Sequence, residues 1–406
     1  MDVSFDSVAI VAAVAVVAPL AVSVPRLRLP AIVVEILLGI AVGPQLLGWA
    51  TVDEPVTVMS RIGLAFLLLL AGLEIDFGRL RGRVLRLTSL SFAVSFAVAL
   101  AVGYGLSAAD LVKSPLLIAI ILSATGLGII LPILKDAGET STAFGQVVVA
   151  GASIAEVGPI VLLSLFFSGE SGGLGSKLVL LLGFAVFVAA VAATILGLER
   201  SMRVSETLVR LQDTTAEIRV RCAFLLLALF VVLASQFGLE AILGAFLAGA
   251  TLKLVDRDEG MTHAFFHRKL EAVGFGVFVP FFFVATGIDL DVSSLFDSAS
   301  ALARVPIFLA ALLVVRALPA LLYRPLAERG RQLVAGGLLQ ATSLSIPVVA
   351  GQIGVDLGLI RPVNYVALVA AGLLSVVIFP LVALTLLRQP ERNATGASET
   401  GAAWAS

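Results

Sequence analysis

Apolar stretches separated by short polar connections recur along almost the whole chain. A helix needs about 20 apolar residues to cross the hydrocarbon core of a bilayer. We therefore expect an all-α integral membrane protein, with one transmembrane domain over residues 1–390 and a polar tail over 391–406. The pattern predicts thirteen spans, at about 7–24, 30–49, 57–75, 87–107, 115–134, 143–168, 177–198, 219–237, 239–254, 271–288, 299–322, 332–354 and 362–387.

Composition agrees with this prediction. Of the 406 residues, 59% are hydrophobic and 14% are charged, whereas about 25% of the residues in a soluble domain are charged. A net charge of -1 without a basic patch excludes nucleic acid as a partner. One cysteine, Cys222, excludes an internal disulfide, and no motif for a metal ion or an organic cofactor stands out, so we expect neither.

Cationic residues concentrate in the odd-numbered connections between spans, and acidic residues in the even-numbered ones. The third connection carries Arg79 and Arg83, for example, and the second carries Asp53 and Glu54. Because cytoplasmic loops are rich in Lys and Arg, the odd connections and the C-terminus should be cytoplasmic and the N-terminus should lie outside.

Four short motifs of the first half recur in the same order in the second half, at offsets that rise only from 205 to 221. They pair residues 35–39 with 240–244, 72–76 with 287–291, 124–129 with 341–346, and Gly151 and Pro159 with Gly372 and Pro380. Each motif of the first unit recurs seven spans later along the chain. Because seven is an odd number, the two five-span units must lie in opposite orientations. Such an inverted repeat favours a transporter with alternating access. A duplicated channel or membrane enzyme is the alternative.

The fifth and twelfth spans carry helix-breaking clusters at the same repeat position, Thr125-Gly-Leu-Gly128 and Thr342-Ser-Leu-Ser-Ile-Pro347. We expect two interrupted helices that cross at mid-depth and direct their half-helix ends at one point, where carbonyl oxygens and partial charges can hold an ion. Thr125, Thr342 and Ser345 are candidate oxygen ligands. Alternatively, the small residues only permit close helix packing.

Two ionisable residues lie well inside the spans, Glu156 and Arg316. Intramembrane charges are costly and usually functional. In the repeat, Glu156 corresponds to Val377, so the carboxylate is not duplicated with its surroundings. A carboxylate in an apolar setting can hold a proton and release it when a cation arrives, and Glu156 is therefore the predicted shared site. For Arg316, we expect charge compensation, either of carbonyl ends in the broken helices or of Glu156.

Four segments together resemble the monovalent cation:proton antiporter-2 family, which includes the Kef-type and Nha-related exchangers. They are LPAIVVEILLGIAVGP at 29–44, FLLLLAGLEID at 66–76, LGAFLAG at 243–249 and PFFFVATG at 280–287. The resemblance implies a prokaryotic plasma-membrane transporter, not an enzyme, that exchanges Na⁺ or K⁺ for protons. It also implies a homodimer.

The same resemblance implies a scaffold that forms the dimer and a core that moves against it as an elevator. The scaffold would comprise residues 7–75 and 219–288, the core 87–168 and 299–387, and a linker 177–198. The family usually has two polar residues where this chain has Ala155-Glu156. With one titratable carboxylate, one cation per proton is the simplest stoichiometry. A cation channel or sensor on this scaffold, and a sodium-coupled organic anion transporter of the same fold, remain alternatives.

Overall fold

The computed structural model describes residues 5–23, 29–75, 78, 80, 82–167, 174–199, 217–255, 261–327 and 330–388. This part of the chain is built from helices and contains no strand. Within it, nine helices are long and apolar enough to cross a membrane, and four further apolar helices are shorter. The predicted all-α membrane class is confirmed, whereas the count of thirteen spans stays a prediction.

Most helices follow the predicted ranges closely. In chain order they are α1 (Asp6–Val22), α2 (Ala31–Val42), α3 (Glu54–Leu73), α4 (Gly82–Ala108), α5 (Pro115–Leu122), α6 (Leu127–Asp136), α7 (Ala143–Phe167), α8 (Leu174–Glu199), α10 (Ile218–Gln236), α11 (Ala241–Val255), α12 (Met261–Val273), the π-helix η1 (Gly274–Phe278), α13 (Val279–Asp289), η2 (Val292–Leu295), α14 (Ala299–Ala317), η3 (Pro319–Leu326), α15 (Gly330–Gln340), α16 (Ser345–Asp356) and α17 (Pro362–Arg388).

Local sequence explains where several of these helices begin and end. Asp53 caps α3, accepting a hydrogen bond from Val56 N at 3.1 Å, and Ser114 caps α5 in the same way through Leu117 N. Helix α2 stops at Val42, earlier than the predicted residue 49. Gly43 precedes a proline and has an extended backbone, a conformation that ends a helix.

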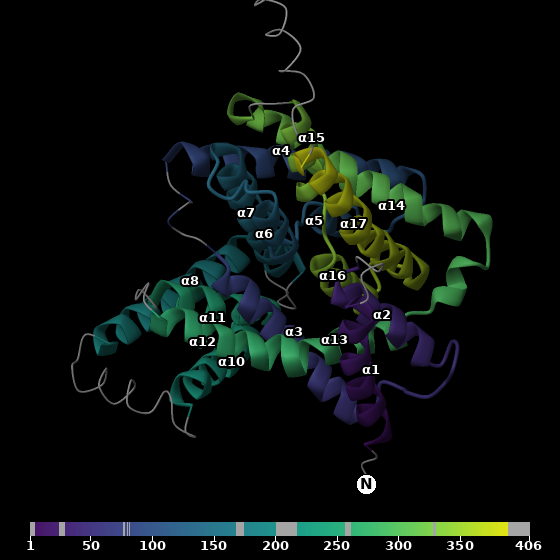
Figure 1. The fold of residues 1–406 in the computed structure, drawn as a ribbon, viewed down its shortest axis with the longest axis horizontal. Helices are drawn as coiled ribbons and strands as arrows, with labels where there is room; N and C mark the ends of the chain where they lie inside the picture. Colours follow the sequence, from purple (N-terminus) through teal and green to yellow (C-terminus); the bar gives the residue numbers. More distant parts are fainter. Residues whose placement is uncertain are drawn as a thin grey trace, which may run out of the picture.

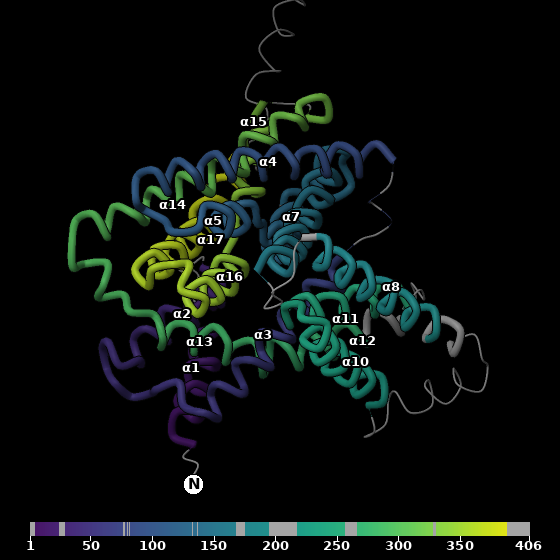
Figure 2. The backbone as a smooth tube through the Cα atoms, turned by 180° about the vertical axis from the view of Figure 1, so that it is seen from behind, coloured from purple at the N-terminus to yellow at the C-terminus, as the bar shows by residue number. Residues whose placement is uncertain are grey.

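The helices pack in two groups, which face each other in Figures 1 and 2. In one group, α1, α2 and α3 pack with α10, α11 and α13. In the other, α4, α5, α6 and α7 pack with α14, α15, α16 and α17. Helix α8 contacts α11 of the first group and α7 of the second. We name the first group the scaffold and the second group the core, after the division that the resemblance implies; that division and any movement between the groups stay predictions.

Glycines bring scaffold helices into backbone contact at several places, and we call two of them the glycine crossings. In the first, a Cβ added to Gly39 of α2 would stand 2.3 Å from Val284 O of α13, and one on Gly287 would stand 2.2 Å from Ile36 O. The second crosses α3 and α11, where a Cβ on Gly249 would stand 1.9 Å from the carbonyl oxygen of residue 69. Real Cβ atoms do not approach this closely, so only glycine fits at these positions.

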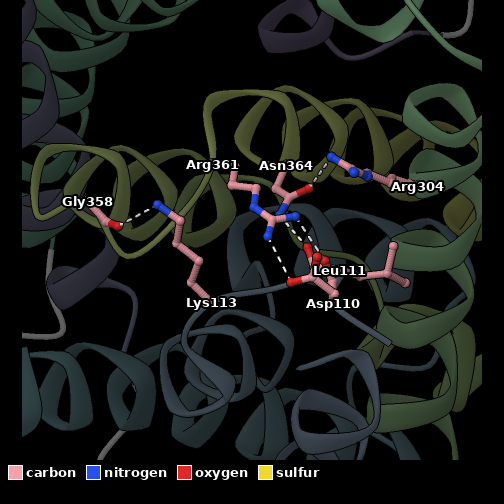
Figure 3. A network of polar contacts seen from close by, with 7 residues as sticks. All are labelled: Asp110, Leu111, Lys113, Arg304, Gly358, Arg361 and Asn364. Atoms are coloured by element: carbon pink, nitrogen blue, oxygen red, sulfur yellow. Dashed lines mark hydrogen bonds and ion pairs between the residues drawn. The ribbon is translucent and has the colours of Figure 1, made fainter. Parts of the chain in front are cut away.

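At one end of the core, the α4–α5 connection is tied to the start of α17 (Figure 3). Arg361 donates to the carbonyl oxygen and to Oδ1 of Asp110, both at 2.9 Å. The Asn364 amide donates to Leu111 O at 2.5 Å. These contacts link the two repeat units of the core, although the Arg361–Asp110 pair is largely exposed and contributes little by itself.

Candidate functional site

The two helices predicted to be interrupted are both broken at the predicted clusters. Helix α5 ends at Leu122 and α6 begins at Leu127, while α15 ends at Gln340 and α16 begins at Ser345. The two breaks lie against each other: Gly126 N donates to Thr342 O at 2.8 Å. The prediction of two crossed broken helices is therefore confirmed, and we call their contact region the polar crossing.

Neighbouring helices bind the backbone groups that the breaks release. Thr125 N donates to Ala155 O of α7 at 3.2 Å. In the second repeat unit, Ser343 N donates to the Ser375 hydroxyl of α17, also at 3.2 Å. An unpaired amide in an apolar interior costs several kcal/mol, about 2 to 7 depending on the reference state. These bonds allow the chain to be non-helical inside the helix bundle.

Arg316 belongs to α14, and its side chain reaches the C-terminal end of α15, where the half-helix carries partial negative charge. Its side chain is 3% exposed. Nε donates to Thr125 Oγ1 at 2.8 Å and to Gln340 O at 3.3 Å, and the two Nη atoms donate to Ser95 Oγ and to Gln340 Oε1. Among the ion pairs of the described residues, none joins Arg316 to Glu156. Of the two expected partners, the guanidinium therefore contacts the helix end.

Glu156 projects from α7 toward the opposite kind of helix end. Its Oε2 accepts a hydrogen bond from Leu127 N, the first residue of α6, at 3.3 Å. The N-terminus of a helix carries partial positive charge and free N–H groups, which together favour an anion. Glu156 thus occupies a position where a carboxylate is stabilised, at the point where the first broken helix resumes.

A second carboxylate faces the same helix start. Glu74 directly follows α3, and its side chain turns toward the core. A Cβ added to Gly128 of α6 would stand 3.5 Å from Glu74 Oε1. Glu74 is also near enough to Glu156 to interact with it electrostatically. Two carboxylates, one from the scaffold and one from the core, therefore converge on the N-terminus of α6.

The three hydroxyl residues predicted as ligands differ in their surroundings. Thr125 donates to Gln340 O at 2.5 Å and accepts from Arg316, so a cation at this oxygen would stand beside a guanidinium. The Thr342 hydroxyl is turned back to Leu338 O of its own helix. Ser345 is half-buried at the first position of α16. The hydroxyls of Thr125 and Thr342 thus have protein partners, and their role as ligands stays a prediction.

Sequence analysis missed two further residues of this region. Gln340 connects three helices, because its Oε1 accepts from Arg316 and its Nε2 donates to Val148 O of α7 at 2.8 Å. It lies two residues before the Thr342 cluster, which was the available signal. For Glu74, the signal was its place in the repeated motif Gly72-Leu-Glu-Ile-Asp76. The described residues contain no group of three or more His, Cys, Asp or Glu side chains that could hold a metal ion.

Comparison with known proteins agrees with this architecture. The sequence model of the transmembrane sodium/hydrogen exchanger family matches residues 12–389. The chain is 29% identical to YjbQ of Bacillus subtilis over 97% of its own length, but it spans only 65% of that relative. It is 25% identical to the Na⁺/H⁺ antiporter of Enterococcus hirae, over 88% of this chain and 91% of the relative.

A solved structure shares the fold. The sodium proton antiporter MjNhaP1 of Methanocaldococcus jannaschii superposes with a TM-score of 0.69, over 94% of this chain and 99% of the other. The two sequences are 18% identical. The arrangement of helices is therefore that of a known membrane transporter.

Proposed function

The chain belongs to the sodium/hydrogen exchanger family, whose members are transporters and not enzymes, and from this premise we propose that it exchanges Na⁺ for protons across the membrane. The observation that carries the proposal is the convergence of Glu156 and Glu74 on the N-terminus of α6. K⁺ is the second candidate cation. A homodimer in the plasma membrane, as the resemblance implies, is part of the proposal.

Glu156 would be the carboxylate that binds either ligand. Two carboxylates close together in a poorly solvated site repel each other unless a cation or a proton lies between them. Binding of Na⁺ therefore favours loss of the proton, and binding of the proton favours loss of Na⁺. This competition at one group couples the two fluxes without requiring any further titratable residue.

Arg316 would maintain the geometry of the site without binding the ion. Its hydrogen bonds hold the end of α15 and the Thr125 hydroxyl in place at the polar crossing. A guanidinium stays protonated throughout a transport cycle. Its charge thus offsets the carbonyl end of the half-helix and leaves Glu156 free to exchange ligands.

Movement of the core against the scaffold would expose this site to each side in turn. The contact between the two groups contains two cavities, which supports such a movement. One, of about 540 Å³, lies near the Glu74 end and is lined by apolar residues of α7 and α11. The other, of about 420 Å³, lies between α3 and α13 on one side and α16 on the other.

The proposed function is tested by the pH change inside proteoliposomes when Na⁺, K⁺ or Li⁺ is added outside. We expect proton movement driven by Na⁺, and its loss in Glu156→Gln, because the amide preserves the shape of the side chain but cannot release a proton. The variant should still insert and melt within a few degrees of the parent protein in detergent. Undiminished exchange in folded Glu156→Gln would refute the assignment of Glu156.

A cation channel is the second candidate function. Ala155 is fully buried and supplies no polar side chain beside Glu156, whereas the related exchangers usually have one there. A channel would carry Na⁺ current in the absence of a proton gradient, and this current would be measured in the same vesicles. Coupled movement of the two ions without such a current supports the exchanger.

A further inference from the structure

The scaffold presents a second carboxylate that corresponds to Glu74 in the inverted repeat. Gly72-Leu-Glu-Ile-Asp76 recurs as Gly287-Ile-Asp-Leu-Asp291, which aligns Glu74 with Asp289. The structure supports this alignment independently, because both glycines lie in the glycine crossings. A Cβ on Gly72 would stand 2.2 Å from Phe246 O of α11, and a Cβ on Gly287 would stand 2.2 Å from Ile36 O of α2. Each carboxylate therefore lies two residues after a glycine that contacts the backbone of a neighbouring helix.

The two carboxylates lie at opposite ends of the scaffold. Helices α3 and α13 run antiparallel: the first half of α3, at Thr57 and Arg61, lines the same cavity as Asp289 at the end of α13. Glu74 instead follows the far end of α3. By the charge pattern of the connections, Glu74 stands at the cytoplasmic end and Asp289 at the outer end.

Glu74 already faces the core at α6, whereas a cavity separates Asp289 from α16, the corresponding helix of the second repeat unit. Glu74 faces Gly128 of α6. In the repeat, Gly128 corresponds to Ser345 of α16. The cavity of about 420 Å³ is lined by Asp289 and by Val348 and Val349, which follow Ser345 by one turn of α16.

We propose that Asp289 is the scaffold carboxylate of the outward-facing site, and that it reaches Ser345 after the core has moved, just as Glu74 faces Gly128 now. The cation would then be held by Glu156 together with Glu74 in one state and with Asp289 in the other. The inference rests on the proposed function, because it assigns a residue to the exchange cycle. An inverted repeat has two states in which its halves exchange surroundings, and this exchange would place Asp289 in the role that Glu74 has here.

The required movement is modest. Val348 and Val349 already face the same cavity as Asp289, so a shift of about one helical turn, roughly 5 Å, would carry Ser345 to that level. The other ionisable side chains that line this cavity are Arg61, Asp356 and Tyr365. Asp356 belongs to the core and moves with it, so it cannot act as a fixed outer partner for the site.

The test measures the KM for Na⁺ separately at each membrane face, in right-side-out and inside-out vesicles. For Asp289→Asn we expect about a tenfold rise in the outer KM, equivalent to about 1.4 kcal/mol, with the inner KM changed less than about twofold. Glu74→Gln should show the reverse pattern. Asp356→Asn removes the same charge from the same cavity and serves as the matched control, with neither KM changed.

An unchanged outer KM in Asp289→Asn, or equal changes at both faces, would overturn the inference, while intact exchange in the same vesicles leaves the proposed function standing. If Asp289→Asn does not fold, disulfide cross-linking tests whether residue 345 approaches residue 289. In a Cys222→Ser background, we expect Asp289→Cys and Ser345→Cys to form a disulfide under an outward Na⁺ load, which needs Cα atoms within about 7 Å. No disulfide in this pair, alongside one in the Asp289→Cys and Val349→Cys pair, would refute the approach of Ser345.

Discussion

Helices cross in two different ways in this protein. At the glycine crossings of the scaffold, backbones touch directly, and a Cβ at Gly249 would stand 1.9 Å from a neighbouring carbonyl oxygen. At the polar crossing of the core, α5 and α6 meet α15 and α16 through hydrogen bonds from Gly126, Thr125 and Arg316. The first contact excludes every side chain, whereas the second consists of exchangeable polar bonds.

This difference indicates that the two kinds of helix contact differ in how readily they can change. Close backbone packing cannot adapt without separating the helices, because protein interiors resist small deformations. A polar crossing can change partners, since a hydrogen bond exchanged for another costs little net free energy. We therefore expect the glycine crossings to tolerate substitution less well than the polar crossing does. Three experiments test this comparison.

The largest effect is expected from a side chain forced into a glycine crossing. Gly249→Leu would drive α3 and α11 apart along their whole contact, and we expect a loss of stability of about 4 kcal/mol or more, enough to prevent accumulation of folded protein. Expression and melting in detergent measure this loss. Gly105→Leu is the matched control, because a Cβ at Gly105 meets no atom within 4 Å. Equal behaviour of the two variants would show that the glycine crossing accommodates a side chain as readily as an open surface position does.

A smaller loss is expected at the polar crossing. Arg316→Ala leaves Gln340 Oε1 and Ser95 Oγ without the donor they have in Arg316, whereas Gln340 O keeps its bond from Thr125. Unsatisfied buried acceptors cost about 1 to 3 kcal/mol each. Because water can enter the vacated space, we expect a total loss of about 2 to 3 kcal/mol. Arg316→Lys retains the charge and part of the hydrogen bonding, so it should lose about half as much. Melting temperatures in detergent that do not change in Arg316→Ala would contradict a charge-compensating role.

Local sequence features predict much of this architecture. Glycine, serine and proline at 125–128 and 342–347 cannot sustain a continuous helix, so both breaks were predictable from composition and position. Repeat symmetry also singled out Glu156, because its counterpart Val377 carries no charge. The bounds were less predictable where a single residue decides them, as at Gly43, whose extended backbone shortens α2.

The contacts of the site were less predictable than its helices. Glu74 follows a helix end, a place where a carboxylate usually meets water, and only the tertiary structure brings its carboxylate near Gly128. Gln340 was passed over because an amide carries no charge, yet its position lets it bind both Arg316 and Val148. Tertiary packing determines both contacts, and neither periodicity nor charge pattern along the chain contains that information.

The smallest effect is expected from membrane voltage, which should leave the exchange unchanged. Moving one net charge across the membrane changes the free energy by about 2.3 kcal/mol per 100 mV. Glu156 belongs to the core and would travel with either one proton or one Na⁺, so its contribution is neutral in both directions. Arg316 also travels, but it carries the same charge out and back.

Glu74 does not alter this expectation, although it is a second carboxylate at the site. It follows α3 of the scaffold, so in the proposed movement of the core its charge would stay in place and would contribute no net charge transfer over a cycle. Exchange should therefore proceed at the same rate in proteoliposomes with and without a potassium diffusion potential clamped by valinomycin. A strong dependence on voltage would mean that a further group in the core releases a proton, or that Glu74 moves with the core. Repeating the measurement with Glu74→Gln separates these cases: voltage dependence that disappears in this variant identifies Glu74 as a moving charge and removes the distinction between a fixed scaffold and a mobile core.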